Sequence, residues 1–135
     1  MAKQHPHIEN PSVNALRELV AERPVAISEL YLAFHELLRE TLPDVAASVD
    51  TVDHAIGYGA HQYGYNGWGM AAVMPYAKWV SLTLMQGSLL DDPADLLTGG
   101  AKMRHVKLAS LDALRAQRGG IRDLIVAASL LHAAP

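Results

Sequence analysis

Three glutamates at helical spacing are the first residues whose arrangement could do chemistry. Glu29, Glu36 and Glu40 fall together on a helical wheel, and Asp44 follows just beyond them. Carboxylates grouped on one face can bind a hard or borderline cation such as iron. The alternative is a solvated helix face opposite an apolar stripe, partly neutralised by Arg39. The sequence thus offers a metal site at Glu29, Glu36 and Glu40 beside a purely structural interpretation.

A second candidate site lies in the middle of the chain, where aromatic residues and glycines alternate. Aromatic rings beside glycine let a ligand approach the backbone closely. The same residues also fill sheet cores or cover sheet edges, which is the structural alternative. Neither a Gly-Lys-Ser/Thr phosphate loop nor a dinucleotide fingerprint is present. The candidate ligand-binding residues are Tyr58, His61, Tyr63, Tyr65, Trp68 and Trp79.

The histidines are a third source of chemistry. His54, His61 and His105 could form a metal site or support catalysis if the fold brings two of them together. No HxH, HxxxH or HExxH spacing occurs in the part expected to fold, since His5 and His7 lie in the N-terminal arm. There is no GxSxG elbow or other nucleophile motif. A binding role is therefore favoured over catalysis, and the question of an enzyme stays open.

Composition narrows the function classes further. The chain has no cysteine, which excludes disulfides, thiolate metal sites and cysteine nucleophiles. A formal net charge of −3 argues against a dedicated nucleic-acid binder. No apolar run approaches the roughly 20 residues of a membrane span, and the polar N-terminus does not resemble a signal peptide. We therefore expect a cytoplasmic protein with neither nucleic-acid nor membrane partners.

Hydrophobic periodicity predicts two helices before the aromatic segment. Residues 1–9 are expected to form a loose arm. Asn10 can cap a first helix, with Pro11 at its first position. Val13, Leu16, Leu19 and Val20 then recur at helical spacing. A clear apolar stripe predicts a second helix over residues 27–42, which Pro43 ends.

The middle of the chain is predicted to form strands. Residues 44–50 are expected to be helical or irregular. The predicted strands cover residues 52–58, 68–76, 78–86 and 102–109. Asn66-Gly67 indicates a hairpin turn, because both of its turn positions need positive φ.

The C-terminal third is predicted to be mostly helical. A single helical turn follows Asp92, and Ser110 caps a short helix that ends near Leu114. Gly119-Gly120 is expected to break the chain before a last helix over residues 121–131. Together these elements predict one α+β domain over residues 1–135, with a mostly antiparallel sheet covered on one face by N-terminal and C-terminal helices. An exposed strand edge would favour a homodimer.

A string of residues in the second half resembles a known family. The chain is similar to the YdhG-like family, a bacterial domain of unknown function. The residues that carry the resemblance are Tyr58-Gly59, Lys78-Trp79-Val80-Ser81-Leu82, Gly87, Leu90, Asp92-Pro93, Leu96-Leu97, Gly99 and the run from Lys102 to Leu108.

The resemblance implies a compact α+β domain of the bacterial cytoplasm. Some members are labelled intracellular iron chaperones, similar in role to frataxin, and no catalytic residues come with the family. Trp79 stands where relatives often have histidine, and His54 where many have an acidic residue. The leading hypothesis is thus a non-enzymatic binding domain, with iron chaperoning as its concrete form. The alternative is a small-molecule or peptide-binding module that uses the Tyr58–Trp79 aromatic segment.

Overall fold

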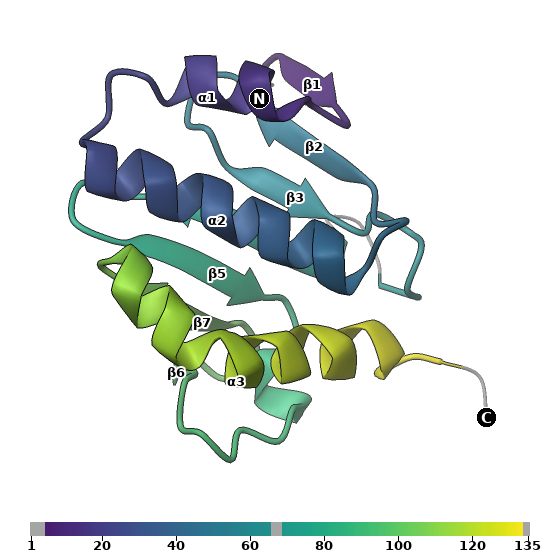
Figure 1. Ribbon diagram of the computed structural model, residues 1–135. Coiled ribbons are helices and arrows are strands. Elements are labelled where there is room, and N and C mark those ends of the chain that lie inside the picture. The colour runs from purple at the N-terminus through teal and green to yellow at the C-terminus, as the bar shows by residue number, and fades with distance from the viewer. Residues whose placement is uncertain (1–4, 66–68, 134–135) are drawn as a thin grey trace.

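The computed structural model describes residues 5–65 and 69–133 of the chain. Within these residues, α-helices and one seven-stranded antiparallel sheet form an α+β fold, as the sequence predicts. The long helices α2 (Val25–Thr41) and α3 (Leu111–Leu130) lie side by side over one face of the sheet. The shorter α1 (Val13–Leu19) lies on the same side of the sheet (Figure 1).

The sheet is antiparallel throughout, and its strands follow the order β1-β2-β3-β4-β5-β7-β6. A short 3-10 helix, η1 (Gly87–Leu89), follows β5. In chain order the strands are β1 (His7–Glu9), β2 (Ala47–Asp50), β3 (Ile56–Tyr58), β4 (Ala71–Pro75), β5 (Val80–Leu84), β6 (Thr98–Gly99) and β7 (Arg104–Leu108).

Helix α2 forms the centre of the core, because its apolar side chains recur at i, i+3, i+4 and i+7. It begins after Pro24 and ends before Pro43, close to the predicted bounds. Its stripe packs on β4 and β5. The buried residues of the stripe are Ile27, Leu30, Tyr31, Phe34, Leu37 and Leu38, all of which the sequence pattern had placed there.

The two faces of the sheet differ sharply. On the helix side Val49, Ile56 and Val73 are completely buried. On the other side, one row of register partners crosses all seven strands, and its members are small or polar. No helix of the described residues covers this side, which we call the open face. Its row is Glu9, Ser48, Gly57, Ala72, Thr83, His105 and Thr98.

The N-terminal arm corrects one prediction. Residues 7–9, expected to be loose, form β1 and pair with β2 at the edge of the sheet. Asn10 does not cap the first helix, because Ser12 does so by accepting the Ala15 N–H at 3.1 Å. Asn10 instead adopts a φ of 47° and accepts the Ala47 N–H through its side chain at 3.0 Å. It therefore ends β1 and holds it against β2.

The segment before the aromatic region also differs from the prediction. The end of the 44–50 segment, expected to be helical or irregular, is strand β2, and residues 51–54 form a turn instead of beginning a strand. The Asp50 carboxylate causes this turn by accepting the backbone N–H groups of Val52 and Asp53. His54 completes the turn with a φ of 68°.

The C-terminal third holds a further correction. The expected break at Gly119-Gly120 is absent, and α3 runs unbroken through both glycines. Two glycines cost a helix roughly 2 kcal/mol relative to alanine, which burial of its apolar stripe easily exceeds. The buried residues of that stripe are Leu114, Ile121, Leu124, Ile125 and Ala128.

Two smaller expectations concern turns. The segment after Asp92 is a turn at residues 93–94 followed by irregular chain, without a helix, although the Asp92 carboxylate does accept the N–H groups of Leu96 and Leu97. The predicted Asn66-Gly67 turn lies outside the residues that the structure describes. The strands on either side of it, β3 and β4, do pair antiparallel.

Candidate metal centre

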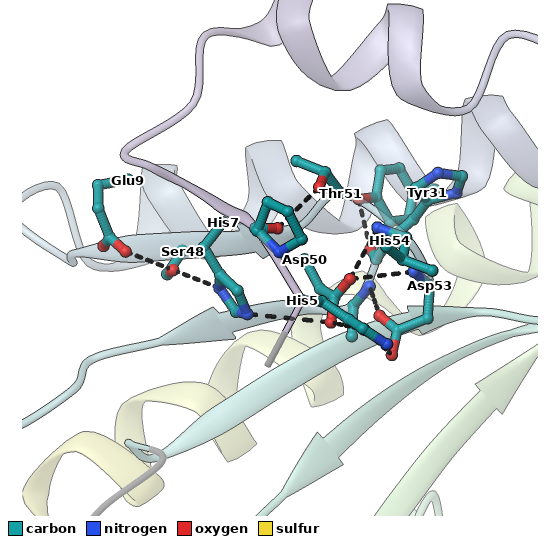
Figure 2. A network of polar contacts seen from close by, with 12 residues as sticks. His5, His7, Glu9, Tyr31, Ser48, Asp50, Thr51, Asp53 and His54 are labelled. Atoms are coloured by element: carbon teal, nitrogen blue, oxygen red, sulfur yellow. Dashed lines mark hydrogen bonds and ion pairs between the residues drawn. The ribbon is translucent and has the colours of Figure 1, made fainter. Parts of the chain in front are cut away.

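Three side chains near the β1 edge of the sheet form a compact group of metal-binding atoms. One ligand atom each from His5, Asp50 and Asp53 lies within 4.8 Å of the other two. Across residues 5–65 and 69–133 this is the one group of at least three such side chains that meets this criterion. Figure 2 shows how the side chains converge from the N-terminal segment and from the turn after β2.

Strand pairing brings the two histidines to the carboxylates. His7 is the register partner of Asp50 across β1 and β2. One residue earlier, the Pro6 carbonyl accepts the Thr51 N–H at 2.9 Å and the Thr51 hydroxyl at 2.7 Å. The chain thus stays beside β2 as far as His5, whose Nδ1 lies 2.6 Å from Asp50 Oδ2. His7 Nε2 lies 3.9 Å from the same oxygen.

Asp50 is held as a carboxylate. Burial by itself would raise its pKa, but the N–H groups of Val52 and Asp53 and the neighbouring His5 outweigh burial and lower it. Both N–H groups bind Oδ1, at 2.7 and 3.1 Å. Oδ2 is therefore the oxygen that Asp50 presents to the two histidines.

The two carboxylate oxygens of Asp53 also have different partners, as those of Asp50 do. Its Oδ1 accepts the Ala55 N–H at 2.9 Å, and its Oδ2 lies 3.9 Å from His5 Nδ1. The backbone bond orients the carboxylate, so that its free oxygen points toward the group that Asp50 and His5 form (Figure 2). Each carboxylate therefore offers one oxygen to an ion and uses the other to hold its place.

A chain of hydrogen bonds sets the orientation of His7. The Ser48 hydroxyl donates to Glu9 Oε1 at 2.8 Å, and Ser48 Oγ lies 2.8 Å from His7 Nδ1. Because Ser48 has a single hydroxyl hydrogen, Nδ1 must be the donor in the second bond. Neutral His7 then carries its lone pair on Nε2, on the side of Asp50. This arrangement, in which an outer partner selects the ring tautomer, is typical of metal-ligating histidines.

The turn that carries Asp50 and Asp53 is supported from the helix side of the sheet. Tyr31 of α2 donates its hydroxyl to the His54 carbonyl at 2.7 Å. Arg23 Nε donates to His54 Nδ1 at 3.2 Å. Burial, and then the charge of Arg23, lower the pKa of His54, so its ring stays neutral and can accept this bond. His54 thus acts in the support of the turn and not as a ligand.

A cavity of about 490 Å³ opens in front of this group on the open face. His7, Asp50 and Asp53 line one side of it. Its floor is formed by small residues of the sheet, among them Gly57 and Ala72. An ion bound by the group would consequently face this cavity.

The predicted acidic site lies elsewhere. Glu29, Glu36 and Glu40 do line a single groove of about 380 Å³ between α2 and α3. Arg115 and Arg118 line the same groove, and Arg118 forms an ion pair with Glu40. The guanidinium groups compete with a cation for these carboxylates. Iron binding at Glu29, Glu36 and Glu40 stays a prediction.

The predicted aromatic site is not gathered into one pocket among the described residues. Tyr58 is buried in the core with its hydroxyl 2.7 Å from His35 Nδ1, and buried Tyr65 donates to the Ala128 carbonyl at 2.8 Å. Tyr63 is half-buried and His61 is exposed. Trp79 stacks with Tyr76 at 5.3 Å between ring centroids and lies under the Lys107 ammonium. Trp68 lies outside the described residues.

Sequence reasoning missed the group because it set the arm aside. His5 and His7 form an HxH pair, and alternation along a strand puts such side chains on one face. Asp50 and Asp53 flank a short turn. These were usable signals, but they point to a site only once the arm is known to pair with β2. The mid-chain histidines stay apart: His54 contacts Arg23, whereas His105 contacts Thr83.

The fold and the group together define an α+β protein with an open sheet face and a candidate histidine–carboxylate metal centre at one edge. No family model matches the chain, and neither a curated protein nor a solved structure matches it. None of the helices in the described parts of the chain has the length and apolar character needed to cross a membrane.

Proposed function

We propose that this chain is a non-enzymatic binding domain for a divalent transition metal, with ferrous iron as the favoured ion. The observation that supports this proposal is the convergence of His5, Asp50 and Asp53 within 4.8 Å. His7 Nε2, 3.9 Å from Asp50 Oδ2, is a fourth donor at the same place.

The donor set favours some ions over others. Ca²⁺ and Mg²⁺ prefer all-oxygen sites, whereas imidazole suits iron, zinc, copper and nickel. Two histidines and one carboxylate on a single face are the ligand set of many non-haem Fe(II) sites. His5, His7 and Asp50 have this composition, and Asp53 adds a second carboxylate. The ligand chemistry therefore supports iron as the ion, and it supports the edge of the sheet as the location of the proposed site.

The resemblance to the YdhG-like family supports the same proposal from a different direction. It rests on Tyr58-Gly59 and on residues between Lys78 and Leu108, a stretch that includes β5, η1, β6 and β7, and none of these residues belongs to the His–Asp group. Some members of that family are labelled iron chaperones. A cytoplasmic iron-handling role is thus part of the proposal, with the acidic groove at Glu29, Glu36 and Glu40 as the alternative location of the metal.

Anaerobic calorimetry with Fe(II) tests the function and its location together. Three proteins are compared: the wild type, a His5→Gln/His7→Gln/Asp53→Asn variant, and a Glu29→Gln/Glu36→Gln/Glu40→Gln variant. Asp53→Asn keeps the amide oxygen that can accept the Ala55 N–H, so the turn is preserved. We expect the wild type and the Glu29/Glu36/Glu40 variant to bind Fe(II). The His5/His7/Asp53 variant should bind Fe(II) at least about tenfold more weakly.

Each other outcome has a definite meaning. Absence of Fe(II) binding by the wild-type protein would remove the proposed function. Loss of binding only in the Glu29/Glu36/Glu40 variant would move the site to the groove between α2 and α3. Thermal unfolding of all three proteins serves as the control for folding.

A further inference from the structure

The cavity on the open face is too large for a hydrated ion alone. Its volume is about 490 Å³, which lies in the range of small-molecule sites. A bound water takes up about 30 Å³, so three waters completing the shell of an ion would fill only about 90 Å³. The remaining space lies over the sheet and has room for a small organic molecule.

The shape of the floor favours a flat molecule. Ser48, Gly57 and Ala72 are register partners on β2, β3 and β4, and all three line the cavity. Gly57 has no side chain and Ala72 has only a methyl group, so the backbone of two neighbouring strands is accessible from this side. A planar group can lie against such a surface with little loss of contact.

The charge of the lining decides when such a molecule can bind. Glu9, Asp50 and Asp53 line the cavity, whereas neither lysine nor arginine is among the described residues that do so. Without a metal this wall repels anions. A divalent cation at Asp50 and Asp53 would offset both of their charges. Binding of an anion should therefore depend on prior binding of the metal.

The open coordination positions of the metal explain how the bound ion and the anion would contact each other. His5, Asp50, Asp53 and His7 can fill three or four positions around an ion. First-row divalent metals commonly take up to six ligands. Because His7, Asp50 and Asp53 line the cavity, the remaining positions face it.

From these observations we infer that the site holds its metal as a ternary complex with a small, planar, anionic oxygen chelator, of the hydroxamate or catecholate class. The two oxygens of the chelator would complete the coordination of the metal, and its flat body would lie over Gly57 and Ala72. This inference rests on the proposed metal binding. It adds the class of the second ligand and the place where that ligand lies.

Calorimetry with Co(II) and benzohydroxamate tests the inference. Co(II) is stable in air and stands in for Fe(II), and benzohydroxamate is a flat oxygen chelator. Protein is kept in excess, so that little metal is free. We expect benzohydroxamate to bind the Co(II)-loaded protein at least about tenfold more tightly than the metal-free protein, and to tighten Co(II) binding by the same factor.

A substitution on the cavity floor distinguishes binding of the metal from binding of the chelator. Ala72→Leu places a larger side chain on the cavity floor and leaves all four metal donors unchanged. We expect Co(II) affinity within about twofold of the wild type and benzohydroxamate affinity reduced at least about tenfold. Ala72→Ser, of similar size, should retain both. Ala72→Val, which suits a strand, replaces the leucine variant if that protein does not fold.

The possible results are distinguishable. If Co(II) does not bind, the proposed function itself fails. If Co(II) binds but benzohydroxamate affinity is the same with and without it, only the ternary complex is overturned. Equal benzohydroxamate affinity in Ala72→Leu and wild type would likewise overturn the placement on the floor. Binding of an organic cation such as benzylamine to the metal-free protein, lost on addition of Co(II), would identify the occupant as an amine instead.

Discussion

His7 and Asp50 are register partners across β1 and β2, with His7 Nε2 3.9 Å from Asp50 Oδ2. This pairing joins the N-terminal segment to a turn more than 40 residues later, since His5 reaches the same carboxylate over a sequence separation of 45. The candidate metal centre thus exists only while the edge strand is in place. Its ligand geometry should respond to any change that loosens either β1 or the turn after β2.

Tyr31→Phe should weaken metal binding without touching a ligand. The variant loses the 2.7 Å bond from the Tyr31 hydroxyl to the His54 carbonyl, which holds the turn that carries Asp50 and Asp53. We expect a stability loss of about 1 kcal/mol and about a tenfold weaker Kd for Fe(II). Calorimetry and urea unfolding measure the two effects.

Tyr65→Phe is the matched control for Tyr31→Phe. Tyr65 is also buried, and its hydroxyl donates to the Ala128 carbonyl in α3 at 2.8 Å. Its loss should lower stability by a similar amount and leave the Kd unchanged. If both variants weaken metal binding equally, the effect reflects stability in general and not support of the turn.

Ser48→Ala should affect the metal site more than the fold. It removes the hydroxyl that accepts from His7 Nδ1 and donates to Glu9, so the His7 ring loses the partner that selects its tautomer. Both bonds are exposed, and we expect a stability change below about 0.5 kcal/mol with a several-fold weaker Kd. Ser129→Ala, which removes an exposed bond within α3, is the control and should change neither. An unchanged Kd in Ser48→Ala would contradict the role assigned to this hydroxyl.

His35→Gln should reduce the loss of stability in mild acid. Burial, and then Arg39, lower the pKa of His35 from 6.5 to about 4. The unfolded chain therefore binds more protons than the folded protein between these values, so stability falls as pH drops from 6.5 toward 4. At 1.36 kcal/mol per pKa unit, the loss from this residue is about 3 kcal/mol. The buried Tyr58 hydroxyl can donate to Nδ1 of neutral His35, and because burial raises its own pKa it supplies no negative charge that would stabilise a protonated ring.

Urea unfolding between pH 7 and 4 measures this effect. The wild type should lose about 3 kcal/mol more than His35→Gln across the window. A smaller slope should persist in the variant, because the pKa values of His54 and His105 are also lowered by burial. Asp50 acts in a different range: its lowered pKa contributes stability that is lost only below its usual value of 3.8. Parallel pH profiles for the two proteins would rule out His35 as the source.

Gly119→Ala should stabilise the protein. The residue lies inside α3, and a Cβ built there meets no atom within 4 Å. Alanine at such a position gains about 0.5–1 kcal/mol, or about 2–4 °C in Tm. At Gly120 the added Cβ would lie 3.0 Å from Leu96 Cδ1, so Gly120→Ala should gain less or lose stability. Differential scanning calorimetry of both variants gives the comparison, and a larger gain at Gly120 than at Gly119 would contradict it.

Local patterns in the sequence were enough to predict much of this fold. The stripe from Ile27 to Leu38 predicts α2, because a helix buries residues that recur every three or four positions whatever its neighbours are. Alternation from Val80 to Leu84 predicts β5 for the same kind of reason. Such periodicities are properties of short segments, and an amphipathic α+β architecture follows from their order.

Features that depend on distant partners escaped those patterns. Residues 7–9 have no apolar pattern and become a strand only by pairing with β2. Gly119-Gly120 is a weak helical sequence, yet the packing of residues on either side keeps α3 intact. In both places tertiary contacts supply more free energy than the local preference of the backbone opposes.

The sequence by itself indicated the glutamates of α2 and the mid-chain histidines as possible cation ligands, and it did not single out His5, Asp50 or Asp53. Tertiary structure alone decided which side chains meet. It pairs Glu40 with Arg118 in an ion pair and brings His5 into contact with Asp50. A metal site requires donor atoms within a few ångströms of one another, and for residues far apart in sequence that distance is set by strand pairing and helix packing, which local patterns do not encode.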